Sequence, residues 1–163
     1  MNSLLRAGGV LTEIYNRNVD TVYRVCFSFM KNRQSTEDMV QETFLKLISS
    51  GAVFDSPQHE KAWLIVTASN LCKNALRHWT SRIESIDGHE ELQAPPEEID
   101  TVLEAIMKLP ENYKTAVYMY YYEGYDTREI AGILRCPHAT VRTRLARARK
   151  MLKTMLGGEF DAE

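Results

Sequence analysis

The sequence has few of the features that mark special protein classes. It contains three cysteines, five prolines and eight glycines in 163 residues. Three cysteines are too few, and an odd number, for a disulfide-stabilised scaffold. No uncharged apolar run approaches the roughly 18 residues that a membrane-spanning helix needs, and Met1–Leu11 lacks the long apolar stretch of a signal peptide. We therefore expect a soluble, cytoplasmic protein that does not insert into membranes.

A large excess of one charge is also missing, because 20 Lys and Arg residues oppose 22 Asp and Glu residues. This balance conceals an uneven distribution. Residues 61–82 carry four basic side chains and no acid, residues 83–101 carry seven acids and no base, and residues 135–158 carry seven basic side chains and no acid. Dense basic segments favour contact with phosphates or another acidic surface, the alternative being a solvated helix face.

The acidic segment has the composition of a linker. It holds Gly88, Pro95 and Pro96 and few apolar side chains, which is typical of a flexible connector. We expect a first domain at residues 1–82, a linker at 83–96 and a second domain at 97–158.

Both predicted domains have the periodicity of helices and lack the alternation of strands. Apolar residues recur at helical spacing over residues 11–30. Ser35 and Asp38 form a capping-box pattern, which predicts Ser35 as the N-cap of a second helix ending near Gly51. A third helix is predicted over residues 58–79. Its predicted inward-facing side chains include Trp63, Leu64, Val66 and Thr67. The expected fold class is therefore all-α, with two small helical domains joined by a flexible acidic linker.

The second domain contains the pattern of a helix-turn-helix. Two predicted helices, over residues 99–108 and 110–123, come first. Asp126 and Glu129 then form a capping-box pattern before a short apolar helix, and a tight turn at Arg135–Pro137 leads into a long basic helix.

The long basic helix has two distinct faces. Val141, Leu145, Ala148 and Leu152 form one apolar stripe. The polar side chains on the opposite face and its flanks are Thr140, Arg142, Thr143, Arg144 and Arg147. Exposed Arg and Thr side chains on such a helix can read base edges in the major groove of DNA, although a basic helix could instead cover a partner protein.

Several short motifs, taken in order, resemble bacterial sigma factors of the sigma-70 family. In the second half these are Leu109-Pro110, Glu123-Gly124, Glu129-Ile130-Ala131 and residues 140–149. In the first half they are residues 37–46 and the series Ala62-Trp63-Leu64, Ala68, Asn70-Leu71 and Leu76-Arg77. The similarity is greatest to the extracytoplasmic-function (ECF) subgroup and spans about Leu11 to Leu156.

The resemblance implies three sets of functional residues. Contact with the clamp helices of the largest subunit of core RNA polymerase is implied for Asp38, Gln41, Glu42, Phe44 and Leu45, with Phe44 or Leu45 as an alternative core residue. Binding and melting of the −10 element is implied for Phe54, Lys61, Asn70, Lys73, Arg77 and Arg82. Binding of the −35 element is expected for His138, Thr140, Arg142, Thr143, Arg144 and Arg147, with helix capping as the alternative for His138. An anti-sigma factor is implied as a further partner.

Some positions depart from the family pattern. Ala139 replaces a usual glycine at the start of the reading helix, Tyr120 stands where relatives often have an arginine that touches −35 DNA, and Val66 stands where an arginine is common. These differences leave the promoter sequence open.

No residue constellation predicts catalysis, a metal site, a cofactor or a small-molecule substrate. Cys26, Cys72 and Cys136 lack metal-binding spacing, and no phosphate-binding glycine loop is present. The function expected from the resemblance is therefore promoter recognition by an ECF sigma factor. The alternative is a stand-alone DNA-binding regulator whose first domain serves dimerisation or signalling.

Overall fold

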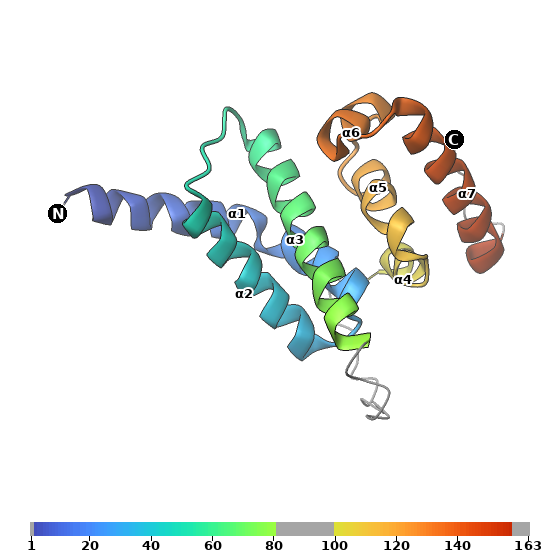
Figure 1. Cartoon of the computed structure of the whole chain (residues 1–163), viewed down its shortest axis with the longest axis horizontal. Helices are drawn as coiled ribbons and strands as arrows, with labels where there is room; N and C mark the ends of the chain where they lie inside the picture. Colours follow the sequence, from blue (N-terminus) through green and yellow to red (C-terminus); the bar gives the residue numbers. More distant parts are fainter. Residues whose placement is uncertain (1, 81–99, 158–163) are drawn as a thin grey trace.

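A computed structural model describes residues 2–80 and 100–157, and every regular element within them is a helix. The helices of the first half are α1 (Asn2–Met30), α2 (Arg33–Ser50) and α3 (Pro57–Thr80). Those of the second half are α4 (Thr101–Met107), α5 (Glu111–Tyr121), α6 (Thr127–Leu134) and α7 (His138–Leu156). The all-α class with two helical domains is confirmed (Figure 1). The predicted linker and Arg82 lie outside the described residues.

The first half is a bundle in which α1 packs against both α2 and α3. Val22, Val25 and Cys26 from α1 are buried together with Leu64 and Ile65 from α3. The periodicity of α1 predicts this core, because residues three and four apart share one helix face. Tyr15, which follows the same spacing, is 44% exposed and so stands outside the core.

The second half contains the predicted helix-turn-helix. The capping box at the start of α6 is confirmed, since the backbone N–H of Glu129 donates to Asp126 Oδ1 at 2.8 Å and the Glu129 carboxylate accepts from the backbone of Asp126. Arg135 ends α6 in the left-handed region at φ 54°. The apolar stripe of α7 is buried as predicted.

The start of α2 differs from the prediction. Asn32, rather than Ser35, is the N-cap, and its Oδ1 accepts from the backbone N–H of Ser35 at 2.8 Å. Lys31 precedes it in the left-handed region, with φ 65°, and this conformation ends α1 and turns the chain into α2. Because the break comes at Lys31, the first available capping side chain is that of Asn32, and Ser35 falls within the first turn.

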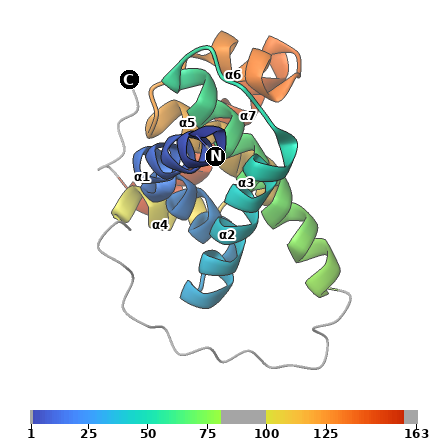
Figure 2. The ribbon, with the colours of Figure 1, turned by 90° about the vertical axis from the view of Figure 1, so that its left-hand side faces the viewer.

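The two halves pack against each other. Helix α1 contacts α4 and α5, and α3 contacts α5 and α6 (Figures 1 and 2). The middle of helix α5 is consequently enclosed, and every residue from Tyr113 to Met119 is buried, whereas Glu111 and Asn112 at its start are exposed. This joint between the halves brings the face of α3 that carries Trp63 and Thr67 opposite the second half. Within the described part of the chain, no helix combines the length and apolar character needed to cross a membrane.

Candidate nucleic-acid interface

The exposed face of α7 presents only part of the predicted −35 set. Arg142, Thr143 and Arg147 are exposed, and the buried stripe holds the opposite side of the helix in the domain. The hydroxyl of Thr143 donates to the carbonyl of Ala139 at 2.9 Å. This bond to its own helix occupies the hydroxyl hydrogen, so Thr143 presents its methyl group and an oxygen that can still accept.

His138 and Thr140 are half-buried at the start of α7. His138 Nε2 lies 2.6 Å from Thr127 Oγ1, which is at the start of α6. This contact joins the first turns of the two helix-turn-helix helices. It does not make His138 a helix cap, because Pro137 is the N-cap of α7 and Asp126 is the N-cap of α6. Further along α7, Arg149 Nε donates to Tyr121 Oη at 3.3 Å, so this basic side chain is tied to α5.

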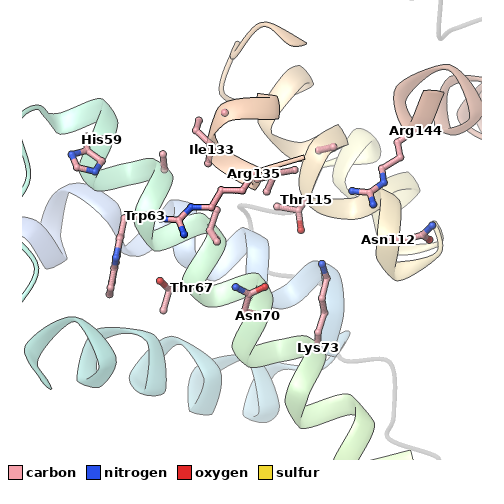
Figure 3. Close-up of a pocket in the computed structure, with 15 residues that line it drawn as sticks. His59, Trp63, Thr67, Asn70, Lys73, Asn112, Thr115, Ile133, Arg135 and Arg144 are labelled. Carbon is pink, nitrogen blue, oxygen red and sulfur yellow. The ribbon is translucent and has the colours of Figure 1, made fainter. Parts of the chain in front are cut away.

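Arg144 is separated from the rest of the −35 set. It is half-buried and lines a cleft of about 690 Å³ between the two halves. Arg135 from the turn lines the same cleft, and Thr115 from α5 forms part of the wall (Figure 3). The sequence pattern placed Arg144 on the flank of the reading face. In the structure, this flank of α7 faces the first half of the chain across the cleft.

The opposite wall of this cleft is the predicted −10 helix. Asn70 and Lys73 of α3 line it together with Trp63, Val66 and Thr67, which were predicted to face the core (Figure 3). The cleft is lined by three basic side chains, Lys73, Arg135 and Arg144, and its lining residues include no carboxylate. Burial and the nearby Arg144 lower the pKa of Lys73, although Glu111 acts in the opposite direction. The cleft is thus an electropositive surface shared by the two domains.

The remaining −10 residues have different surroundings. Arg77 is exposed. It lies four residues after Lys73 on α3 and therefore shares a helix face with Asn70 and Lys73. Lys61 Nζ forms an ion pair with Glu123 Oε2 at 3.1 Å. Phe54 is half-buried, with ring contacts to His59 at 5.4 Å and Trp63 at 5.7 Å between centroids. Stacking of Phe54 on a base would therefore require it to leave this aromatic cluster.

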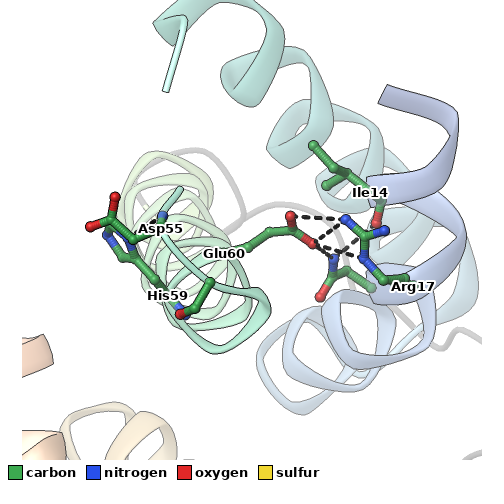
Figure 4. Close-up of polar contacts among 7 residues, drawn as sticks. Ile14, Arg17, Asp55, His59 and Glu60 are labelled. Carbon is green, nitrogen blue, oxygen red and sulfur yellow. Dashed lines mark hydrogen bonds and ion pairs between the residues drawn. The ribbon is translucent and has the colours of Figure 1, made fainter. Parts of the chain in front are cut away.

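A buried carboxylate fixes the start of α3. Glu60 is 6% exposed and accepts hydrogen bonds from Asn18 Nδ2 at 2.7 Å and from the guanidinium of Arg17 at 3.1–3.3 Å. Asn18 also donates to the carbonyl of Ile14 at 2.9 Å. Figure 4 shows Glu60 reaching from α3 to α1, with His59 on the other side of its helix. The network holds the loop that carries Phe54 and the first turns of α3 in place.

The predicted polymerase-binding residues form one side of α2. Asp38, Gln41 and Glu42 are exposed, and Leu45 is 51% exposed. Phe44 is half-buried and contacts the ring of Tyr15 at 4.8 Å, so Phe44 is the one that belongs partly to the core.

Ile48 continues this surface and was missed from the sequence. It is 56% exposed and lies three residues after Leu45 on the same helix face. Its exposure was not evident because an isoleucine at helical spacing is more often part of a core. Leu45 and Ile48 give α2 an exposed apolar patch on the helix that carries Asp38 and Glu42, and the partly exposed Tyr15 of α1 packs against the neighbouring Phe44.

Comparison with known proteins agrees with these observations. Residues 14–82 match the family model of sigma-70 region 2, and residues 99–152 match that of sigma-70 region 4. The chain is 27% identical to the ECF RNA polymerase sigma factor SigW of Bacillus subtilis (strain 168), over 90% of this chain and 87% of SigW. It is 30% identical to the RNA polymerase sigma factor SigV of the same strain, over 84% of this chain and 85% of SigV.

The fold is similar to that of solved sigma factors. With the sigma factor RpoE from Bartonella quintana, whose structure is in complex with the anti-sigma factor NepR, the TM-score is 0.70 at 21% identity, covering 91% of this chain and 98% of RpoE. With CnrH, solved in complex with the cytosolic domain of CnrY, the TM-score is 0.62 at 20% identity.

Proposed function

The chain belongs to the sigma-70 family of RNA polymerase sigma factors, within the ECF group, and we propose that it directs core RNA polymerase to promoters by reading their −35 and −10 elements. The observation that carries the proposal is that two different surfaces, one basic and one acidic and apolar, lie on separate helices. Exposed basic and hydroxyl side chains of α7 face away from its buried stripe, and an acidic and apolar surface on α2 stands apart from them. One chain can therefore meet duplex DNA and a protein at the same time.

Each surface has a distinct proposed role. Arg142, Thr143 and Arg147 read base edges in the major groove of the −35 element. Asn70, Lys73 and Arg77 on α3, together with Lys61, bind the −10 strand as it separates, and the aromatic ring of Phe54 stacks on an unpaired base. Arg82, which lies outside the described residues, is proposed to bind the backbone of the same strand. We propose domain limits of 1–82 and 97–158, with the acidic linker between them.

The proposed polymerase site is on α2. Asp38, Gln41 and Glu42 lie on the turns of α2 that precede the exposed Leu45 and Ile48, and an apolar patch beside acidic side chains fits a basic coiled-coil surface on the largest subunit of the polymerase. The bond-making chemistry belongs to the polymerase, so the chain itself needs no catalytic residue. Since transcription takes place on the chromosome, the proposal places the chain in the cytoplasm. By analogy with RpoE and CnrH, each solved with a second protein, an anti-sigma factor is its proposed regulator.

The deciding experiment is run-off transcription with purified core polymerase on genomic fragments. We expect a stable complex with core and discrete promoter-specific transcripts. Binding to duplex DNA without a complex with core, and without transcripts, would instead indicate a stand-alone regulator.

A substitution in α2 tests the polymerase site itself. Leu45→Asp places a charge at the centre of the apolar patch and should weaken core binding by at least about tenfold, because a hot-spot side chain contributes about 2 kcal/mol or more. Met155→Asp, which changes an exposed apolar residue at the end of α7 (40% exposed), is the matched control. Equal affinity of both variants for core would exclude Leu45 from the contact.

A further inference from the structure

The cleft of about 690 Å³ has two chemically different ends. His59 and Trp63 lie at one end, and Lys73 and Arg144 lie at the other (Figure 3). Arg135 lies between them. Trp63 and Lys73 are ten residues apart on α3, so about 15 Å separates their positions along this wall. The cleft is therefore long enough for a ligand that has an aromatic group at one end and negative charge at the other.

The three basic side chains of the cleft, Lys73, Arg135 and Arg144, form no ion pair within the described residues. Glu111 attracts Lys73 electrostatically, but it is exposed on α5 and does not line the cleft. Like charges that share one cleft repel each other, and a bound anion would replace this repulsion with attraction. The charge of the cleft therefore favours a ligand with several negative charges.

Arg135 occupies a position at which an arginine is unfavourable. It is the C-cap of α6 and has a left-handed backbone conformation, with φ 54° and ψ 49°. Glycine is the usual residue at such a helix end, because a Cβ atom is crowded in this conformation. Strained positions of this kind concentrate at functional sites. The side chain of Arg135 extends from the turn into the cleft (Figure 3), which indicates that the cleft is such a site.

The cleft also contains neutral polar side chains that can bind an anion. Thr115 is only 6% exposed, and within the described residues its Oγ1 has no hydrogen-bond partner. The amides of Asn70 on α3 and Asn112 on α5 line the cleft from its two walls and can donate. A buried hydroxyl without a partner is unfavourable, and a phosphate or ribose oxygen of a ligand would provide one.

The other end of the cleft is aromatic and apolar. Trp63 is half-buried, and Ile133 and Leu134 of the second half line the cleft with it. The ring of Phe54 lies 5.7 Å from that of Trp63 and supports the indole from outside the cleft. A flat heterocycle can lie against the indole while the aliphatic side chains cover its other parts.

We propose that this cleft binds one nucleoside 5′-di- or triphosphate, with its phosphates at Lys73, Arg135 and Arg144 and its base beside Trp63. The volume lies in the range of sites that enclose one small molecule, whereas a DNA strand of several nucleotides needs more space. Nucleotide binding does not depend on the proposed function. If that function holds, a bound nucleotide competes with the −10 strand for Lys73.

Isothermal titration calorimetry of the full chain tests both ends of the site, with ATP, adenosine and inorganic tripolyphosphate as probes. The titrations are done at physiological ionic strength, which screens weak surface attraction. We expect ATP to bind one to one with a Kd below about 1 mM. Adenosine and tripolyphosphate should each bind at least about tenfold more weakly, because each contacts only one end of the cleft.

Variants separate ligand contacts from effects on folding. Arg144→Ala removes a charged donor and should weaken ATP binding about tenfold. Arg135→Gly should weaken it similarly and also raise the melting temperature, since glycine relieves the left-handed backbone. Trp63→Leu should weaken ATP binding but leave tripolyphosphate binding unchanged. Arg128→Ala, at an exposed position of α6 outside the cleft, is the matched control for lost charge. Circular dichroism identifies any variant that has lost its helices.

Three results would each overturn the proposal. The first is no binding of ATP, or the same affinity for ATP in wild type, Arg135→Gly, Arg144→Ala and Arg128→Ala. The second is equal binding of ATP and tripolyphosphate, which would make the cleft an unspecific anion site. The third is binding of a single-stranded oligonucleotide, but not of ATP, that depends on Trp63 and Arg144. The titrations contain neither polymerase nor promoter, so a failure of run-off transcription would overturn the proposed function without changing them.

Discussion

At the scale of single residues, exposure and bonding divide side chains that look alike in the sequence. Arg142, Arg144, Arg147 and Arg149 all belong to one basic helix, yet Arg144 faces the cleft and Arg149 is bonded to Tyr121. Arg142 and Arg147 remain exposed on the reading face. Of these four arginines, only Arg142 and Arg147 therefore have the surroundings expected of base-reading residues.

The strongest residue-scale test of this division is Arg147→Ala. We expect it to weaken binding to the −35 duplex by about 1–3 kcal/mol and to relax specificity at one base pair, because a bidentate contact to guanine is lost. Electrophoretic mobility shifts with a set of single-base −35 variants measure both effects. Lys153→Ala, at an exposed position further along α7, should weaken all variants equally and only reduce the salt dependence. The same loss on every −35 variant for Arg147→Ala would show that Arg147 contacts a phosphate.

Glu60 allows a second residue-scale prediction. Glu60→Gln keeps the size of the side chain but removes the charge that accepts from Arg17 and Asn18. We expect the free energy of unfolding to fall by about 1–3 kcal/mol, since hydrogen bonds to a buried charged group are lost. Urea unfolding followed by circular dichroism measures the loss. Glu37→Gln, in an exposed pair with Arg33, should leave the midpoint unchanged, and equal midpoints for wild type and Glu60→Gln would exclude this stabilising role.

At the scale of helices, local sequence signals define most of the elements. The capping box of α6 and the apolar stripe of α7 were predicted from a few neighbouring residues, and both are confirmed. Such signals succeed because the bonds they describe join residues three or four apart. The start of α2 shows their limit, since the sequence pattern predicted Ser35 as the cap, whereas the break at Lys31 makes Asn32, three residues earlier, the actual N-cap.

The two candidate caps of α2 can be distinguished by mutation. Asn32→Ala should lower the free energy of unfolding by about 1 kcal/mol, because it removes the acceptor of the Ser35 backbone N–H. Ser35→Ala should have a much smaller effect, since Ser35 is inside the helix. Thermal melting of both variants provides the measurement. A larger loss for Ser35→Ala would restore the capping prediction made from the sequence.

At the scale of the whole molecule, the buried Lys114 makes the stability of the fold depend on pH. Its pKa is about 8 in the folded chain, against 10.5 for an ordinary lysine. Between these two values the folded chain has released a proton that the unfolded chain still holds. Raising the pH from 7 to 9.5 should therefore stabilise the folded chain, and this contribution is lost as the pH falls through about 8.

Urea unfolding at pH 7, 8.5 and 9.5 measures this dependence. We expect wild type to gain about 1–2 kcal/mol relative to Lys114→Met, which has no titrating group at this position. A parallel pH dependence of the two proteins would show that Lys114 titrates as an ordinary exposed lysine.

The sequence by itself determined the helical class, the order of the helices, the helix-turn-helix and the membership of a family of promoter-recognition proteins. These features depend on periodicity, caps and motifs, which are local in the chain. It also identified the buried face of α7 correctly, because this helix has one apolar stripe that must be buried.

Only the tertiary structure decided which helix faces meet at the contact between the two halves. Trp63, Val66 and Thr67 were expected in the core of the first half, but they line the cleft. Residues 113–119 of α5 are all buried, although they include the polar Lys114 and Thr115. The contacts responsible join residues far apart in sequence, such as Lys114 with Ser28 and Lys61 with Glu123. A local pattern carries no information about such pairs, since their energy depends on how two complete domains fit together.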